Sequence, residues 1–159
     1  MTAKAIAKRF EKSIHFDIDY IRSLVVSGLK QPTDGWDEET ANQFQLAHKA
    51  VGQMAKVYSD AGFTVVAEHC SSPNDVKTFV KNAGQVSVVC LKSDLKINLE
   101  RNLMRTEKSF DPNDIEHFVH SLGDSLHKEL HQAGFAVLDT THLSVEQAVE
   151  EIISLRTLF

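Results

Sequence analysis

The chain has 159 residues and a formal net charge of -5, with 42% hydrophobic and 25% charged residues, as in one ordinary globular domain. The lack of a basic run argues against a nucleic-acid surface, and the lack of a long apolar run argues against a membrane span. Two widely spaced cysteines, Cys70 and Cys90, form no disulfide framework, so we expect a cytoplasmic protein with a single domain over residues 1–159.

Apolar periodicity and helix-end signals predict helices and strands that alternate along the chain. The predicted elements are helix 2–12, strand 14–18, helix 19–29, helix 37–61, strand 63–67, a helix capped by Ser72, strand 86–91, helix 94–105, helix 112–133, strand 135–138 and a last helix capped by Ser144. The strands over 63–67 and 86–91 are continuous and apolar, which is typical of strands buried on both faces. This order predicts an α/β fold, a three-layer sandwich with a parallel sheet of about four strands.

The first candidate site lies at the end of the strand over 14–18, where Asp17 and Asp19 are followed by Arg22. Ligands of parallel sheets bind beyond the carboxyl ends of the strands, and alternation would turn both acids to one side of this strand. A carboxylate there can accept the proton of an attacking hydroxyl or hold a magnesium-bound water, while Arg22 binds the substrate by a forked contact. The alternative makes Asp19 a helix N-cap and Arg22 a surface residue.

Two further candidates lie near other strand ends. Arg101 and Arg105 share one helical face and could neutralise the charge on a transferred phosphoryl group, or form a solvated face with local ion pairs. Glu68, at the end of the strand over 63–67, could order a magnesium-bound water or be an ordinary strand-end carboxylate.

Histidines and one tryptophan are the remaining candidates. The eight histidines include a stripe on the helix over 112–133 that faces solvent, where ligands do not converge, so we predict no metal site. His69 lies near the presumed site and either touches the substrate or is a packed or capping residue. Trp36 either lines the acceptor pocket or packs under the loop over 30–37.

In their order and spacing, four segments resemble the P-loop small-molecule kinases, the group of adenylylsulfate kinase, gluconate kinase, chloramphenicol phosphotransferase-like proteins and kinase-like AAA-type ATPases. The segments are FDIDYIR at 16–22, which is similar to a D-x-D-x-x-R motif, AGFTVVAE at 61–68, LERNLMR at 99–105, which looks like the lid arginines, and LDTTHLS at 138–144, which looks like the last strand and the turn beside the adenine. The resemblance covers Thr2 to Phe159. It implies an ATP-dependent phosphotransferase, a kinase for a small molecule or nucleotide that uses ATP and Mg²⁺.

The resemblance also implies a role for each candidate residue. Asp19 would be the acceptor base or a magnesium contact, with Asp17 as the alternate, and Arg22 would bind the acceptor. Arg101 and Arg105 would act on the ATP phosphates across a lid at about 105–112. Glu68 would lie at the cofactor, and Thr140 and Thr141 would lie beside the adenine.

The chain departs from the family at its start. Family members begin with a strand and the loop G-x-x-x-x-G-K-[ST], whereas Thr2 to Lys8 matches only the helix after that loop. We therefore expect the first strand to be missing, ATP to bind weakly, and the chain to be truncated or inactive as given. The strands over 63–67 and 86–91, which flank the missing strand in the family, should pair directly or have another segment between them.

The alternative function is a non-catalytic kinase-like module that binds a ligand or a partner, with a homodimer through the incomplete sheet as one form. The codons upstream of Met1 would separate the two functions. An in-frame glycine-rich loop would favour the kinase, and an in-frame stop would favour the module.

Overall fold

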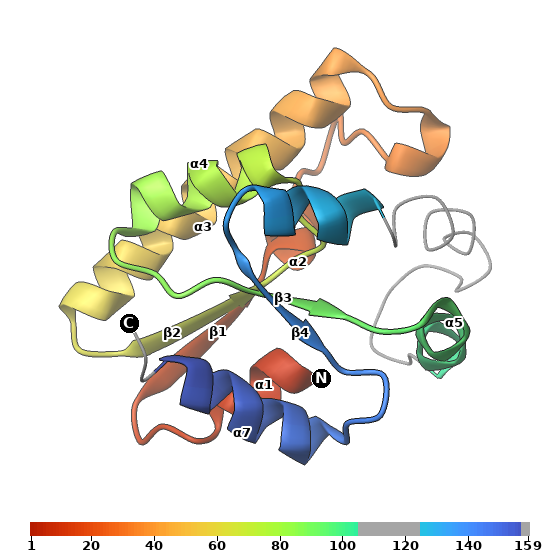
Figure 1. Ribbon diagram of the computed structural model, residues 1–159. Helices are drawn as coiled ribbons and strands as arrows, with labels where there is room; N and C mark the ends of the chain where they lie inside the picture. The colour runs from red at the N-terminus through yellow and green to blue at the C-terminus, as the bar shows by residue number, and fades with distance from the viewer. Residues whose placement is uncertain (105–124, 157–159) are drawn as a thin grey trace. The chain divides into compact units, whose positions relative to one another are not determined.

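The computed structural model describes residues 1–104 and 125–156 of the chain (Figure 1). The chain divides into two compact units, one made of Met1–Ser87 with Val145–Phe159 and the other of Val88–Ser144. Compact units are not by themselves separate domains, so the single domain stays a prediction. No helix within the described ranges combines the length and the apolar character needed to cross a membrane.

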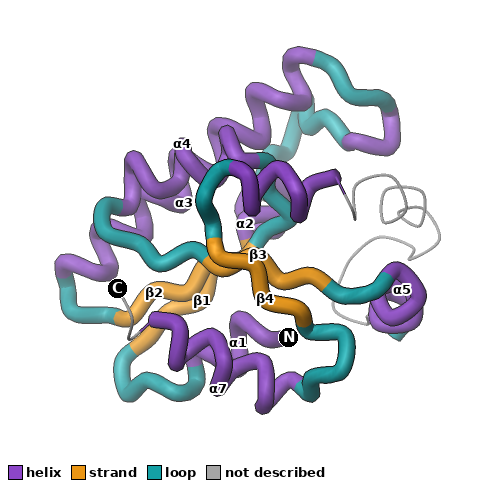
Figure 2. The backbone as a smooth tube through the Cα atoms, in the orientation of Figure 1, coloured by secondary structure: helices purple, strands orange, loops and turns teal. Residues whose placement is uncertain are grey.

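The first unit is built around a parallel pair of strands with helices on both faces. Its elements are α1 (Thr2–Ala7), β1 (Ser13–Asp17), α2 (Ile18–Ser23), the short 3-10 helix η1 (Pro32–Asp34), α3 (Glu38–Asp60), β2 (Thr64–Glu68), α4 (Pro73–Ala83) and α7 (Val145–Arg156). The strand register runs from Ser13 opposite Thr64 to Asp17 opposite Glu68. In Figure 2, α1 and α7 cover one face of the pair, and α3 covers the other with α4 packed against it. This is the three-layer α/β arrangement that the alternating sequence pattern predicts.

Within its described residues the second unit holds two more strands, which are again parallel. Its described elements are β3 (Val89–Lys92), α5 (Leu95–Leu103), a helical segment over 125–132 and β4 (Ala136–Asp139). The prediction of about four parallel strands is therefore confirmed, and among the described residues the ladders join them in two pairs, β1–β2 and β3–β4. Two arrangements are predicted for the strands over 63–67 and 86–91. Direct pairing is not found among the described residues, because β2 pairs with β1 and β3 pairs with β4. The other arrangement, with a further segment between them, stays a prediction.

A small apolar cluster holds α3 against the β1–β2 pair. Phe16, Ile18, Ala47 and Val51 are buried there, and Val51 is fully enclosed. Along α3, the buried positions Ala47, Val51 and Ala55 follow the 3.6-residue period that the sequence predicts for this helix. Burial of each large apolar side chain contributes about 1.5–3 kcal/mol, so this cluster fixes the height of α3 over the strands.

Helix α2 is shorter than the sequence predicts. It ends at Ser23 rather than at Leu29. The β-branched Val25 and Val26 lose side-chain freedom in a helix, and Gly28 adopts a φ of +80°, outside the helical region. The chain therefore leaves the helix early, and Val26 is fully exposed.

Two other elements also differ from their predicted form. α1 ends at Ala7 rather than at Lys12. The Ala7 carbonyl accepts a hydrogen bond from the Ser13 hydroxyl at 2.6 Å. β2 is only partly buried along its whole length, although its apolar sequence predicts burial on both faces. Among the described residues β1 is its one ladder partner.

Side-chain caps fix the N-termini of α3 and α4. Asp37 Oδ1 accepts from the Thr40 N–H and from the Thr40 hydroxyl, both at 2.7 Å. These bonds, together with Lys30, hold the pKa of Asp37 well below its usual 3.8. On α4, Ser72 Oγ accepts from the Asp75 N–H at 3.3 Å, and Asp75 Oδ2 accepts from the Ser72 N–H at 3.0 Å, which together make a capping box. The predicted cap at Ser72 is therefore confirmed.

Candidate functional site

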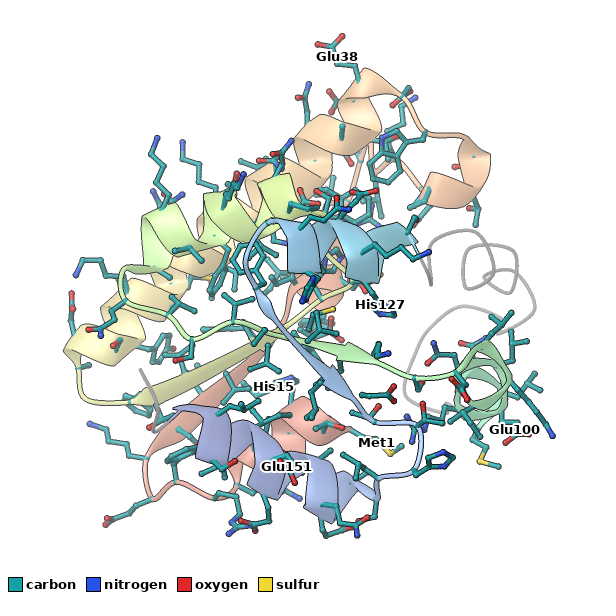
Figure 3. All side chains as sticks on the ribbon, in the orientation of Figure 1. Met1, His15, Glu38, Glu100, His127 and Glu151 are labelled. Carbon is teal, nitrogen blue, oxygen red and sulfur yellow. The ribbon has the colours of Figure 1, made fainter. Side chains whose placement is uncertain are left out.

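The carboxyl ends of β1 and β2 carry the three acids that the sequence singles out, Asp17, Asp19 and Glu68. Asp17 ends β1 and caps α2, where its Oδ1 accepts from the Tyr20 N–H at 3.3 Å. Glu68 lies opposite Asp17 in the strand register. Its Oε1 is 3.1 Å from Nε2 of His15, which Figure 3 labels. The polar edge predicted at these strand ends is therefore present.

The prediction that alternation turns Asp17 and Asp19 to the same side of a strand is wrong. β1 ends at Asp17 and α2 begins at Ile18, so Asp19 lies in the first turn of the helix. The alternative that made Asp19 the N-cap is wrong as well, because Asp17 occupies that position. The cap formed by Asp17 is the physical reason, since it starts the helix one residue earlier than predicted.

Asp19 contacts a buried pair of histidines through His69. His69 Nε2 lies 3.0 Å from Asp19 Oδ1, and His69 Nδ1 lies 3.0 Å from the Ser71 hydroxyl. The same hydroxyl lies 2.9 Å from His48 Nε2, and His48 Nδ1 donates to the Phe44 carbonyl at 2.8 Å. The Asp19 side chain is 39% exposed, whereas that of His69 is 4% exposed. The cluster therefore runs from a carboxylate that solvent can reach into the core beside α3.

Arg22 is buried, which rules out the interpretation that it is a surface residue. Its guanidinium donates to the Lys30 carbonyl at 2.6 Å and to Gln31 Oε1 at 3.2 Å, and lies 4.4 Å from the centre of the Phe44 ring. Burial lowers the pKa of Arg22, and the nearby Asp19 carboxylate opposes that shift. In this arrangement Arg22 holds the loop after α2, and its contact with a substrate stays a prediction.

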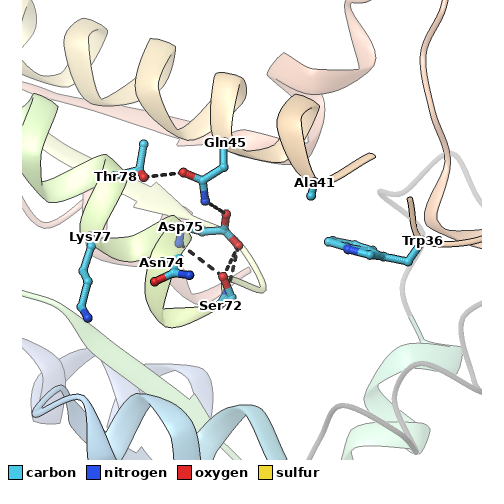
Figure 4. A pocket seen from close by; sticks show the side chains of 8 residues that line it. All are labelled: Trp36, Ala41, Gln45, Ser72, Asn74, Asp75, Lys77 and Thr78. Carbon is cyan, nitrogen blue, oxygen red and sulfur yellow. Dashed lines mark hydrogen bonds between the residues drawn. The ribbon is translucent and has the colours of Figure 1, made fainter. Parts of the chain in front are cut away.

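A pocket of about 490 Å³ opens beside α3 and α4 (Figure 4). Its lining residues are Trp36, Ala41, Gln45, Ser72, Asn74, Asp75, Lys77 and Thr78. Trp36 is 63% exposed, stacks on Phe44 with 5.2 Å between ring centres, and lies across the pocket from Lys77. On the wall of the pocket, Gln45 Nε2 donates to Asp75 Oδ1. The predicted acceptor residue Trp36 therefore lines a pocket.

In the second unit, Arg101 and Thr140 meet at the carboxyl ends of β3 and β4. Arg101 Nη1 donates to Thr140 Oγ1 at 3.1 Å, and its Nη2 donates to the Thr140 carbonyl at 2.8 Å. Thr140 is buried, and both its N–H and its hydroxyl donate to the Lys92 carbonyl. The structure thus brings together one predicted phosphate residue and one predicted adenine residue. Arg105 and the predicted lid lie outside the described residues.

Thr141 joins the same strand end to the start of α5. Its hydroxyl donates to Asp139 Oδ1 at 2.6 Å and accepts from the Asp94 N–H at 3.0 Å. Asp139 Oδ1 also accepts from the Thr141 N–H at 3.0 Å, and Asp139 Oδ2 pairs with Lys92 Nζ at 3.0 Å. The bonds from Thr141, and next the ion pair with Lys92, hold the pKa of Asp139 well below its usual range.

The chain matches no protein-family model and no curated protein sequence. Among solved structures it is similar to the tunicamycin resistance protein of Deinococcus radiodurans, with a TM-score of 0.56. The match covers 99% of this chain and 90% of that chain, at 18% sequence identity. The fold is P-loop kinase-like. At this identity the likeness shows the fold alone, so membership of the predicted superfamily and of its specific subfamilies stays a prediction.

The kinase resemblance predicted from the sequence implies ATP and Mg²⁺, and the described residues offer no cluster of metal ligands for Mg²⁺. Within 1–104 and 125–156, no three His, Cys, Asp or Glu side chains form a group that could hold a metal ion. Glu68 and Asp19 each contact a histidine instead. The motif G-x-x-x-x-G-K-[ST], whose backbone N–H groups bind phosphates, does not occur in the 159 residues. Neither acid is therefore assigned as a metal ligand.

Sequence reasoning missed His48 and Ser71, which complete the cluster behind Asp19. His48 lies four residues after Phe44, on the face of α3 predicted to be buried, and its side chain is 1% exposed. A polar residue on a predicted buried face indicates a buried hydrogen-bond network, and that signal is present in the sequence. Ser71 gives no local signal, because its role depends on two rings that the fold brings to it.

Proposed function

We propose that this chain is a kinase-type phosphotransferase domain, which transfers a phosphoryl group from ATP to a hydroxyl of a small molecule or nucleotide. The observation that carries the proposal is the position of Asp19 in a P-loop kinase-like fold. Asp19 lies in the first turn of a helix at the carboxyl end of a parallel strand, reaches solvent and contacts the buried His69. In this proposal Asp19 accepts the proton of the acceptor hydroxyl, with Asp17 as the alternate.

The pocket beside α3 and α4 supports an acceptor that carries a ring. Trp36 offers an exposed aromatic face and Lys77 a positive charge, two groups that bind ring systems and anions. The Phe44 ring connects Trp36 to His69, which contacts the acceptor base Asp19. The centre of the Phe44 ring lies 5.2 Å from the ring centre of Trp36 and 5.4 Å from that of His69. Arg22 would support this acceptor side by holding the neighbouring loop.

The residues proposed to bind the nucleotide follow from the kinase resemblance and from contacts within the second unit. Arg101 and Arg105 would act on the ATP phosphates, with Thr140 and Thr141 beside the adenine and Glu68 near a magnesium-bound water. The convergence of Arg101, Thr140 and Thr141 at the ends of β3 and β4 supports these roles. We also propose a cytoplasmic location, which fits two cysteines that are thiols rather than a disulfide. A homodimer is the proposed oligomeric state.

Titration of the 159-residue chain with Mg·ATP is expected to show a dissociation constant weaker than the micromolar range. The sequence contains no glycine-rich loop to neutralise the triphosphate, and two arginines do not replace one. Isothermal titration calorimetry measures the affinity, with adenosine as the control ligand. Adenosine should bind about as well as Mg·ATP if the phosphates contribute little. Micromolar affinity for Mg·ATP would contradict the prediction.

Replacing Asp19 with asparagine should lower acceptor-dependent phosphoryl transfer at least about tenfold, because the carboxylate that takes the proton is lost. The effect is smaller than for many general bases, since the transition state of phosphoryl transfer is loose. Transfer of labelled phosphate from concentrated ATP is measured against a panel of sugars, nucleosides and tunicamycin, the last because the similar structure is a tunicamycin resistance protein. Asp34→Asn changes an exposed acid of η1 and serves as the control.

Equal transfer by the Asp19→Asn and Asp34→Asn variants would remove Asp19 from the reaction. Acceptor binding without any transfer would favour the alternative, a non-catalytic kinase-like module. The lack of a glycine-rich loop within the 159 residues is the observation that favours this alternative. Trp36 is the one tryptophan of the chain and lines the pocket, so its fluorescence reports acceptor binding directly.

A further inference from the structure

The hydrogen bonds of the cluster Asp19–His69–Ser71–His48 determine which ring nitrogens carry protons. The Phe44 carbonyl can only accept, so His48 Nδ1, 2.8 Å away, carries a proton. An ionised Asp19 can also only accept, so His69 Nε2, 3.0 Å away, carries a proton. A neutral imidazole has a single N–H, which in each ring makes one of these two contacts. The other nitrogen of each ring can then only accept a hydrogen bond.

Ser71 cannot satisfy both rings if both are neutral. Its hydroxyl lies 2.9 Å from His48 Nε2 and 3.0 Å from His69 Nδ1. Two neutral rings would present an acceptor at each of these positions, and the hydroxyl has one proton to donate. One additional proton removes the conflict, because a charged ring donates to Ser71 and Ser71 donates to the neutral ring. Without it, a buried ring nitrogen would lack a hydrogen bond, which is unfavourable in the core.

The additional proton belongs on the His69 side of the cluster. Burial lowers the pKa of His48, and the neighbouring His69 lowers it further, so His48 favours the neutral form. His69 instead contacts the Asp19 carboxylate, the opposite charge that stabilises an imidazolium. Among the described residues, the other charged groups at the cluster include two of opposite sign. Asp75 Oδ1 is 4.0 Å from His48 Nδ1, and the charge of Arg22 interacts with Asp19.

We propose that the cluster holds one proton more than two neutral rings and an ionised Asp19 supply, that His69 carries this proton beside the Asp19 carboxylate, and that His69 is a positioning residue for Asp19. His69 fixes Oδ1 of the carboxylate through its Nε2–H. Ser71 and His48 connect this contact to α3, where the Phe44 carbonyl anchors the His48 ring. Only the role of Asp19 as acceptor base rests on the proposed function, and the proton count does not depend on it.

Nuclear magnetic resonance of the histidine rings in the full chain tests this proposal without an activity assay. At neutral pH, wild-type His69 should carry protons on both ring nitrogens, and His48 should be neutral with its proton on Nδ1. Ser71→Ala removes the shared hydroxyl and with it the need for the additional proton, so His69 should lose its Nδ1 proton. Ser71→Thr keeps a hydroxyl at this position and should retain the wild-type pattern. His69→Gln assigns the His69 signals.

Asp19→Asn provides a second test at a position that solvent reaches. Without the carboxylate, His69 should become neutral at the same pH. A neutral wild-type His69, or a His69 that stays doubly protonated in Ser71→Ala, would overturn the proposal. Loss of phosphoryl transfer in Asp19→Asn with unchanged ring protonation would overturn the proton count while supporting the proposed function. The expected ring pattern in a chain that transfers to no acceptor would support the cluster and overturn the proposed function alone.

Discussion

Replacing Asp75 with alanine is expected to lower the free energy of unfolding by about 2–4 kcal/mol. This figure is the sum of the cost of losing a helix cap and the cost of leaving buried donors without an acceptor. Asp75 is 8% exposed. Its Oδ2 accepts from the N–H of Ser72 at 3.0 Å and from the Ser72 hydroxyl at 2.7 Å, while its Oδ1 accepts from Gln45. Alanine would remove the acceptor for all three donors at the point where α4 begins beside α3.

Chemical unfolding in urea, followed by the fluorescence of Trp36, measures this difference. Asp75→Asn should be intermediate, because its amide oxygen keeps one acceptor while its NH₂ group faces donors. Asp60→Ala is the matched control. That exposed acid pairs with Lys56 one turn away in α3, and its loss should cost no more than about 0.5 kcal/mol. If Asp75→Ala and Asp60→Ala had equal stability, the network around Asp75 would contribute nothing to the fold.

Replacing Gly52 with alanine should lower the free energy of unfolding by about 1–3 kcal/mol, although alanine is the better helix former. Gly52 lies where α4 packs on α3. A Cβ at this position would lie 2.8 Å from the Phe79 carbonyl oxygen and 2.8 Å from Asn82 Cβ. The main-chain carbonyl cannot yield as a flexible side chain would, so the steric cost exceeds the gain of about 1 kcal/mol in helix propensity.

The same unfolding experiment separates packing from propensity. Gly52→Leu should cost more than Gly52→Ala, since more atoms enter the same contact. Gln53→Ala, on the exposed side of α3, should change stability by no more than about 0.5 kcal/mol. A Gly52→Ala variant at least as stable as the wild type would show that α3 and α4 do not approach each other this closely. Because Ser72 caps α4 and Asp75 lies in its first turn, a displaced α4 should also weaken ligand binding in the pocket.

Local sequence signals predicted most of the fold. The buried face of α3, the Ser72 cap of α4 and the four parallel strands each follow from residues that are close together in the chain. The failures have local causes as well. Val25 and Val26 end α2 early, and the cap formed by Asp17 starts that helix one residue sooner than strand alternation suggests.

The sequence by itself determined where the chemistry-bearing side chains lie along the chain, including Asp19 at the carboxyl end of a strand. Only the tertiary structure decided what each of them contacts. His69 reaches Asp19 across 50 residues, and Ser71 reaches His48 across 23. Periodicity fixes which face of a helix is buried, but it does not fix which residues of another element lie opposite that face. Those partners depend on how closely α3 packs on the strands and on α4, which is a property of the whole first unit.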